Sequence, residues 1–205
     1  MKIIKTKNLK VNILEKYLTY NDINIDKGAF VYIKGCNGSG KTTLLKVLSG
    51  FIEYEGKIMK NENINIGYYF QDFFLIDDFT IKENIELVVG YNINNGQENI
   101  IYDFLSSFNI LSLYNIKVKH LSLGQKQIIC FLRMVVSNSE ILLFDEPSSN
   151  LDVENRLKLN NKILKLSSEG KTIFFTSHYS QDEEYFLKNI KDEKFVLINI
   201  DNENK

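Results

Sequence analysis

The segment GCNGSGKTT, residues 35–43, has the residue types and spacing of a phosphate-binding loop, G-x-x-x-x-G-K-[ST]. Its glycines let backbone N–H groups point toward phosphate oxygens, and a helix that begins after the loop adds the positive end of its dipole. In such a loop Lys41 reaches the β- and γ-phosphates of a nucleotide, and the Thr42 hydroxyl binds Mg²⁺. A chance match is the alternative, but the loop lies between an expected strand and an expected helix, as phosphate binding requires. We therefore predict a nucleotide site.

Two carboxylates, Asp145 and Glu146, directly follow the apolar run ILLF at residues 141–144. In open α/β sheets ligands gather at the carboxyl ends of the strands, where Asp145 can hold Mg²⁺. Glu146 can orient and deprotonate a water in line with the γ-phosphate. The alternative is a solvated Asp-Glu turn. Burying a charge without a partner costs free energy, so charged residues at the end of a buried strand are expected to have a function. We therefore favour the catalytic interpretation.

The segment HLSLGQKQ, residues 120–127, precedes a long apolar run and contains no paired carboxylates or activated nucleophile. Ser122 and Gln125 have the spacing of a capping box, with serine at the N-cap and glutamine at the third helical position. The pattern predicts a helix that begins here. It leaves open whether the segment only starts a helix or also forms half of an active site.

The elements that must position these residues are short apolar runs that alternate with polar helical stretches. This alternation indicates the α/β class with a largely parallel sheet. Five of the expected strands are at residues 30–34, 63–70, 141–144, 172–176 and 195–200.

Helices are indicated by apolar residues that recur on one helical face. The segment 41–50 is a helix that stops at Gly50, and an amphipathic helix follows residue 122. Between them, residues 81–89 and 98–108 are helical pieces of an insert. We expect one domain over 1–205. Its nucleotide-binding core comprises 1–71 and 136–205, and its helical subdomain comprises about 72–135, including the helix after residue 122.

The composition is that of an ordinary globular domain. The chain has 205 residues, 44% hydrophobic and 25% charged, with a net charge of −1. This balance does not favour binding to nucleic acid. Two cysteines fit a reducing cytosol. Charges interrupt the N-terminal segment every few residues, so we expect no signal peptide, and no apolar run reaches the roughly 18–20 residues of a membrane span.

Taken in order, the motifs resemble those of the ATP-binding-cassette (ABC) ATPases over nearly the whole chain. GCNGSGKTT is similar to the Walker A loop, LSLGQ to the signature motif, and ILLFDEP to Walker B with its glutamate. Gln71 is similar to the Q-loop glutamine, SNLD at 149–152 to the D-loop, and Ser177-His178 to the switch histidine. The resemblance implies a P-loop NTPase core with a mostly parallel sheet, an N-terminal antiparallel β portion and an inserted α-helical subdomain.

The resemblance also implies an Mg²⁺-dependent ATPase that dimerises head to tail around two ATP molecules. The catalytic residues would be Glu146, His178 and Gln71, with Thr42, Gln71 and Asp145 at the metal. The nucleotide-binding residues of one protomer would be Gly35, Cys36, Asn37, Gly38, Ser39, Gly40, Lys41, Thr42 and Thr43. The other protomer would contribute Ser122, Gly124, Gln125 and Asp152.

The sequence departs from the family pattern at several positions. Leu123 stands where the signature usually has glycine, a form similar to that of some drug- and peptide-export ATPases, and Ile128 stands where arginine is common. The aromatic residue that stacks on adenine has no clear counterpart. Tyr17 and Tyr20 are candidates, although the best register places aliphatic residues there.

The function that the resemblance implies is the ATPase subunit of a membrane transporter, and the leucine form of the signature favours an exporter of the drug or peptide type. Its partners would be a second cassette, identical or related, and a polytopic membrane subunit on a separate chain, which would hold it at the cytoplasmic face. That subunit would dock near Phe73, Phe74 and Leu75, unless these residues only pack within the insert. The alternative is a non-transport ABC ATPase, such as one for iron–sulfur assembly. A P-loop kinase or GTPase would leave the signature segment and His178 without a role.

Overall fold

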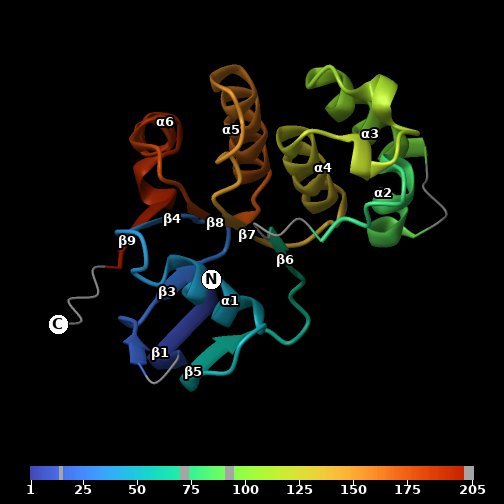
Figure 1. The fold of residues 1–205 in the computed structure, drawn as a ribbon. Helices are drawn as coiled ribbons and strands as arrows, with labels where there is room; N and C mark the ends of the chain where they lie inside the picture. The colour runs from blue at the N-terminus through green and yellow to red at the C-terminus, as the bar shows by residue number, and fades with distance from the viewer. Residues whose placement is uncertain (14–15, 70–73, 91–94, 201–205) are drawn as a thin grey trace.

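A five-stranded parallel sheet forms the centre of the molecule, in the strand order β6-β7-β8-β4-β9 (Figure 1). The computed structural model describes residues 1–13, 16–69, 74–90 and 95–200. The strands are β4 (Phe30–Lys34), β6 (Ile66–Tyr69), β7 (Ile141–Asp145), β8 (Thr172–Thr176) and β9 (Phe195–Asn199). All five overlap the predicted runs, and the predicted strand at 63–70 is shorter than expected.

The apolar runs are continuous because both faces of this sheet are buried. In β7, Leu142 and Phe144 point into a core beneath the helices, while Ile141 and Leu143 point into a second core on the opposite face. The period of two in a strand separates the two sets. The register pairs Asp145 at the end of β7 with Thr176 at the end of β8, so these two strands end side by side.

The N-terminal part forms the predicted antiparallel β portion. In it β1 pairs with β2, β3 and β5, all antiparallel. Its strands are β1 (Lys2–Ile13), β2 (Lys16–Thr19), β3 (Asn24–Asp26) and β5 (Glu55–Lys60). Their apolar residues complete the second core together with helix α1 (Lys41–Ser49), which ends at Gly50 in the left-handed conformation that the sequence predicts.

The remaining helices cover the other face of the parallel sheet or extend to one side of it (Figure 1). They are α2 (Ile81–Val89), α3 (Asn95–Ser107), α4 (Leu123–Val136), α5 (Val153–Ser168) and α6 (Ser180–Asn189), with short 3₁₀ turns at Leu111–Leu113, Val118–His120 and Asp192–Lys194. Helix α2 has the predicted bounds, and α3 begins three residues before the predicted segment. In the part of the chain that the structure describes, no helix has both the length and the apolar character needed to span a bilayer.

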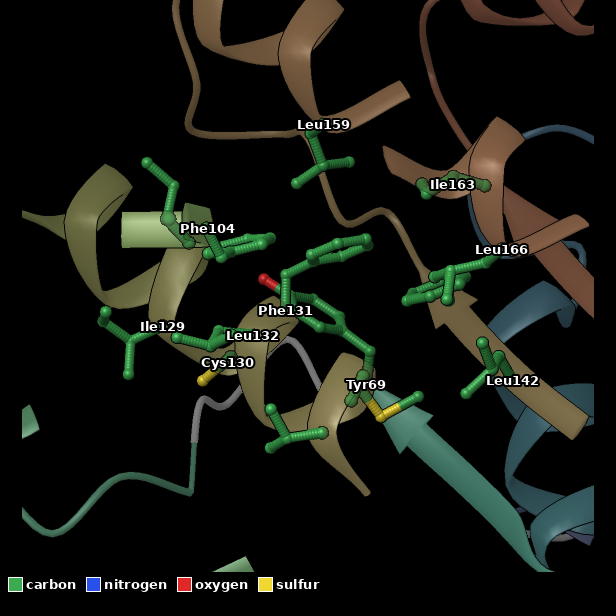
Figure 2. Close-up of a cluster of buried hydrophobic side chains, with 14 of the residues drawn as sticks. Tyr69, Phe104, Ile129, Cys130, Phe131, Leu132, Leu142, Leu159, Ile163 and Leu166 are labelled. Atoms are coloured by element: carbon green, nitrogen blue, oxygen red, sulfur yellow. The ribbon is translucent and has the colours of Figure 1, made fainter. Parts of the chain in front are cut away.

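The side chain of Phe131 connects the helical region to the sheet. It lies in α4 with its ring stacked on Phe104 of α3 at 5.8 Å and on Phe144 of β7 at 5.2 Å between ring centroids. Figure 2 shows Phe131 beside Phe104 in a cluster with residues of α4, α5 and β7. Because Phe144 directly precedes Asp145, this packing fixes α4 against the strand end that carries both predicted carboxylates.

We expect Phe131→Ala to lower the free energy of unfolding by about 3–5 kcal/mol, because it removes a fully buried ring that stacks with two other rings. Leu187→Ala on the exposed face of α6 is the control and should cost less than about 1 kcal/mol. Urea denaturation of both variants measures the difference. Equal losses would show that Phe131 does not connect the two parts.

Candidate nucleotide site

The predicted phosphate loop lies between β4 and α1, and its shape depends on two glycines. Gly40 is the N-cap of α1 with φ 102°, and a Cβ there would lie 2.7 Å from the Tyr20 hydroxyl. At Gly35, a Cβ would lie 2.5 Å from the Ser39 Oγ. Both positions therefore exclude a side chain for steric reasons, which the motif alone does not reveal.

Lys41, the first residue of α1, folds its side chain back over the loop. Its ammonium donates hydrogen bonds to the carbonyl oxygens of Gly35 at 2.8 Å and Cys36 at 3.1 Å. The residue is only 6% exposed, so its charge is held within the loop by the loop's own backbone. Cys36 itself is exposed.

Asp145 and Glu146 lie at the end of β7 and are joined to β8 through one hydroxyl. The Glu146 backbone N–H donates to Thr176 Oγ1 at 3.0 Å, and this hydroxyl donates to Asp145 Oδ1 at 3.0 Å. Asp145 is 1% exposed, and the solvated Asp-Glu turn is excluded by this burial. Glu146 has φ 51°, an unusual conformation for a residue other than glycine, which turns the chain sharply after the strand.

The side chains of Glu146 and His178 are in contact, with Glu146 Oε1 and His178 Nε2 2.5 Å apart. Burial raises the pKa of the Glu146 carboxyl, and the adjacent Asp145 acts in the same direction, whereas His178 and Lys41 oppose the shift. The His178 side chain is 44% exposed, so the pair has a buried carboxyl and an accessible imidazole.

A cleft of about 560 Å³ brings most of the predicted cis residues together. Two aliphatic side chains, Ile13 and Leu18, line one part of it. The remaining lining residues are Asn37, Gly38, Gly40, Lys41, Thr42, Thr43, Glu146 and His178. An open cleft that combines a phosphate loop with a carboxyl–imidazole pair suits a phosphorylated ligand.

The tyrosines considered for adenine stacking are not among the residues that line this cleft. Tyr20 is buried, and its hydroxyl donates to the Gly40 carbonyl at 2.9 Å, so it supports the loop from beneath. Burial raises the Tyr20 pKa to about 12. Tyr17 is 51% exposed on β2. The cleft is lined instead by two aliphatic residues, Ile13 and Leu18, of which Leu18 lies between the two tyrosines in the sequence.

The segment HLSLGQKQ forms the capping box that the sequence predicts. The Ser122 hydroxyl accepts from the Gln125 N–H at 3.2 Å, and the Gln125 side chain accepts from the Ser122 N–H at 2.9 Å. Leu123 is 54% exposed at the start of α4. A Cβ on Gly124 would lie 3.1 Å from the Asn150 carbonyl oxygen, so the signature segment and the D-loop segment of one chain are in close contact.

Gln127 strengthens that contact and is a site residue that the sequence analysis missed. Its side chain is 1% exposed, accepts from the Asn150 N–H at 3.0 Å, and donates to Ser149 Oγ at 3.3 Å and the Glu146 carbonyl at 3.4 Å. The sequence did contain a signal for this role: Gln127 is a polar residue on the helical face that also carries the apolar residues Phe131 and Met134.

The four residues predicted to act in trans lie elsewhere. Ser122, Gly124, Gln125 and Asp152 are not among the described residues that line the cleft. Asp152 is the N-cap of α5, and its carboxylate accepts from the backbone and side-chain nitrogens of Asn155 at 2.8 and 2.9 Å. The N-termini of α4 and α5 are thus both capped by residues of the same chain.

Gln71, predicted both at the metal and in catalysis, lies outside the described residues, as does Phe73. Among the residues that the structure describes, no cluster of three or more His, Cys, Asp or Glu side chains is arranged to hold a metal ion. The oxygen donors predicted for Mg²⁺ are therefore limited here to the Thr42 hydroxyl and the Asp145 carboxylate.

The comparisons with known proteins agree with these motifs. Residues 18–149 match the ABC transporter family. The chain is 30% identical to the cytochrome c biogenesis ATP-binding export protein CcmA of Reclinomonas americana, over 98% of this chain and 96% of the relative. It is also 30% identical to the lipoprotein-releasing system ATP-binding protein LolD of Buchnera aphidicola, over 84% and 86%.

Solved structures show the same fold. The dimeric structure of MJ0796, a bacterial ABC transporter cassette, has a TM-score of 0.77 and 26% identity, over 97% of this chain and 95% of that one. A dimeric post-hydrolysis state of the same cassette, bound to ADP and Pi, has a TM-score of 0.74 and 27% identity, over 88% and 90%. The chain therefore belongs to the ABC transporter family, and it is an ATP-hydrolysing nucleotide-binding subunit with the P-loop cassette fold.

Proposed function

We propose that this chain pairs head to tail with a second cassette, identical or related, so that two ATP molecules are enclosed between them. The observation that carries this proposal is the separation of two half-sites. The cleft holds the phosphate loop with Glu146 and His178, whereas the N-terminus of α4 with Ser122 and Gly124 lies outside it. A second chain can bring its α4 N-terminus, with the positive end of the helix dipole, to the triphosphate.

Within the cleft we assign nucleotide binding to the phosphate loop and the α1 N-terminus. Lys41 now donates to two loop carbonyls, and the same ammonium would turn to the β- and γ-phosphates when ATP enters. The side chains of Asn37, Thr42 and Thr43 line the same wall. With Ile13 and Leu18 beside it, the adenine would rest on aliphatic side chains in place of an aromatic ring.

Thr42 and Asp145 fit Mg²⁺, because a hydroxyl and a carboxylate are the hard oxygen ligands that this ion prefers, with the substrate phosphates completing its shell. Gln71 is the third proposed ligand. Mg²⁺ would neutralise charge that develops on the phosphates during transfer.

Hydrolysis needs a base near the γ-phosphate, and we assign that role to Glu146. Its buried carboxyl and raised pKa suit proton transfer from water at neutral pH. His178 contacts the Glu146 carboxyl and is exposed toward the cleft, so it can orient that carboxyl and contact the γ-phosphate. Asp152 would communicate across the dimer from the start of α5.

A second pocket, of about 230 Å³, supports a membrane partner on a separate chain. It is lined by residues of α2, α4 and β6, including Val88, Met134 and Tyr69, and by Phe74, which is 65% exposed. Arg133 Nη1 donates to the Phe74 carbonyl at 2.7 Å and holds that segment against α4. We infer that a helix of a polytopic subunit docks here and holds the chain at the cytoplasmic face of the membrane.

Export is the favoured direction of transport. CcmA and LolD are described as an export protein and a lipoprotein-releasing protein, and Leu123 gives the signature a form found in some exporters. The alternative is a non-transport ABC ATPase, for example one for iron–sulfur assembly. Purification from membranes with a multi-span protein supports transport, whereas recovery with soluble scaffold proteins would contradict it.

Glu146→Gln tests the proposed base. The amide keeps the shape of the side chain but cannot accept the proton, so ATP hydrolysis should fall by about 10²–10⁴-fold while ATP still binds. The ATP-bound dimer should then accumulate in size-exclusion chromatography. Glu140→Gln, which removes only a surface pair with Lys27, is the matched control and should hydrolyse ATP normally. Turnover near wild type in Glu146→Gln would remove Glu146 from this role.

Ser122→Asp separates helix capping from a contact in trans. Aspartate caps as well as serine, so the melting temperature should stay close to wild type. Its carboxylate would face the γ-phosphate across the dimer, so ATP-dependent dimerisation and hydrolysis should be lost. Ser122→Ala should instead lower the unfolding free energy by about 0.5–2 kcal/mol. If Ser122→Asp hydrolyses ATP normally, the serine is only a cap.

A further inference from the structure

Asp182 is a buried carboxylate that none of the motifs includes. It lies in the first turn of α6 and is 1% exposed. Its Oδ2 accepts from Ser177 Oγ at 2.6 Å and from Ser148 Oγ at 3.2 Å. Its Oδ1 accepts from Asn160 Nδ2 at 2.7 Å and lies 3.9 Å from Arg156 Nε. A buried charge with this many partners holds its surroundings in a defined arrangement.

The two serines belong to the segments that carry the proposed catalytic side chains. Ser148 follows Glu146 by two residues, and Ser177 directly precedes His178. The Ser177 hydroxyl also accepts from the Tyr179 N–H at 3.0 Å, which closes the turn around the histidine. One oxygen of Asp182 therefore anchors both segments, and the side chains of Glu146 and His178, which these segments carry, are in contact.

Arg156 extends this anchoring to the helix that follows the D-loop segment. Its guanidinium stacks on the Tyr179 ring, 4.2 Å from the centroid, and it faces Asp182 from α5. The Tyr179 hydroxyl donates to the Ser149 carbonyl at 3.3 Å. The turn around His178 is thus tied to α5 and to the segment after Glu146, with Asp182 as the common acceptor.

We propose that Asp182 is a positioning residue for ATP hydrolysis, which holds the turn of His178 and the turn after Glu146 so that the two side chains meet in the cleft. The inference rests on the roles proposed above for Glu146 and His178. Asp182 does not line the cleft among the described residues, so it acts through the serines. Because displacement of a reacting group by about 1 Å can cost roughly 10²-fold in rate, its loss should slow catalysis and leave ATP binding intact.

The test compares Asp182→Asn with Glu184→Gln, a change at an exposed acid on the same helix. The asparagine keeps the size of the side chain but replaces one acceptor oxygen by a donor and removes the charge that faces Arg156. We expect kcat, counted per chain that binds ATP, to fall by roughly 10–10²-fold, with KM for ATP within about threefold of wild type. Glu184→Gln should match wild type. Unchanged kcat, or a higher KM at constant kcat, would overturn the proposal.

Measurements in the His178→Ala background distinguish positioning from general stability. Because Asp182 holds both turns, only the part of its effect that passes through the histidine turn should disappear in this background. Adding Asp182→Asn should therefore lower kcat by a smaller factor than it does with His178 present, although it lowers the melting temperature equally in both backgrounds. An equal loss of kcat in both backgrounds would overturn the proposal. Should Asp182→Asn not fold, Ser177→Ala should show the same fall in kcat at constant KM, and wild-type kcat there would overturn it.

These outcomes separate the inference from the proposed function. Slow hydrolysis in His178→Ala together with normal hydrolysis in Asp182→Asn would overturn the role of Asp182 alone. Wild-type hydrolysis in His178→Ala would overturn the role assigned to the histidine and this inference with it.

Discussion

The parallel pairing of β7 with β8 is the constraint on which the site depends. Register places Asp145 opposite Thr176, and the Thr176 hydroxyl joins the Asp145 carboxylate to the Glu146 N–H. The next residues of both strands then leave the sheet side by side, so Glu146 and His178 meet although 32 positions separate them in the sequence (178 − 146). Burial of the strand ends in turn requires that every polar group there has a partner.

The helical region is attached to this strand end at two points. The Phe131 ring packs on Phe144, one residue before Asp145, and the Gln127 amide binds the backbone after Glu146. Both residues belong to α4, whose N-terminus carries the signature segment. A shift of the Glu146 turn in one chain is therefore expected to move the N-terminus of α4, which in the proposed dimer faces the other chain's nucleotide. Asp182 restrains the same turn through the Ser148 hydroxyl.

Much of the fold and of the candidate site could be predicted from the sequence, because the patterns that indicate them lie among neighbouring residues. The capping box of Ser122 and Gln125, the stop at Gly50 and the strand before Asp145 each depend on neighbouring residues and are confirmed. The contacts of Tyr20, Gln127 and Asp182 join segments far apart in the chain, so spacing alone could not reveal them. For Tyr20 the sequence suggested base stacking as one possibility, whereas burial and its hydrogen bond to Gly40 give it a structural role.

Head-to-tail closure around ATP is the central claim, and a crosslink tests it most directly. Cys36 of the phosphate loop is naturally exposed and Cys130 is buried, so Leu123→Cys places a second exposed thiol at the start of α4, away from the cleft of its own chain. With a short thiol-reactive crosslinker, in the Glu146→Gln background, ATP should produce a covalent dimer that is absent without nucleotide and absent in Leu123→Cys chains that lack Cys36. A covalent dimer that forms equally without ATP, or no dimer with it, would contradict the account.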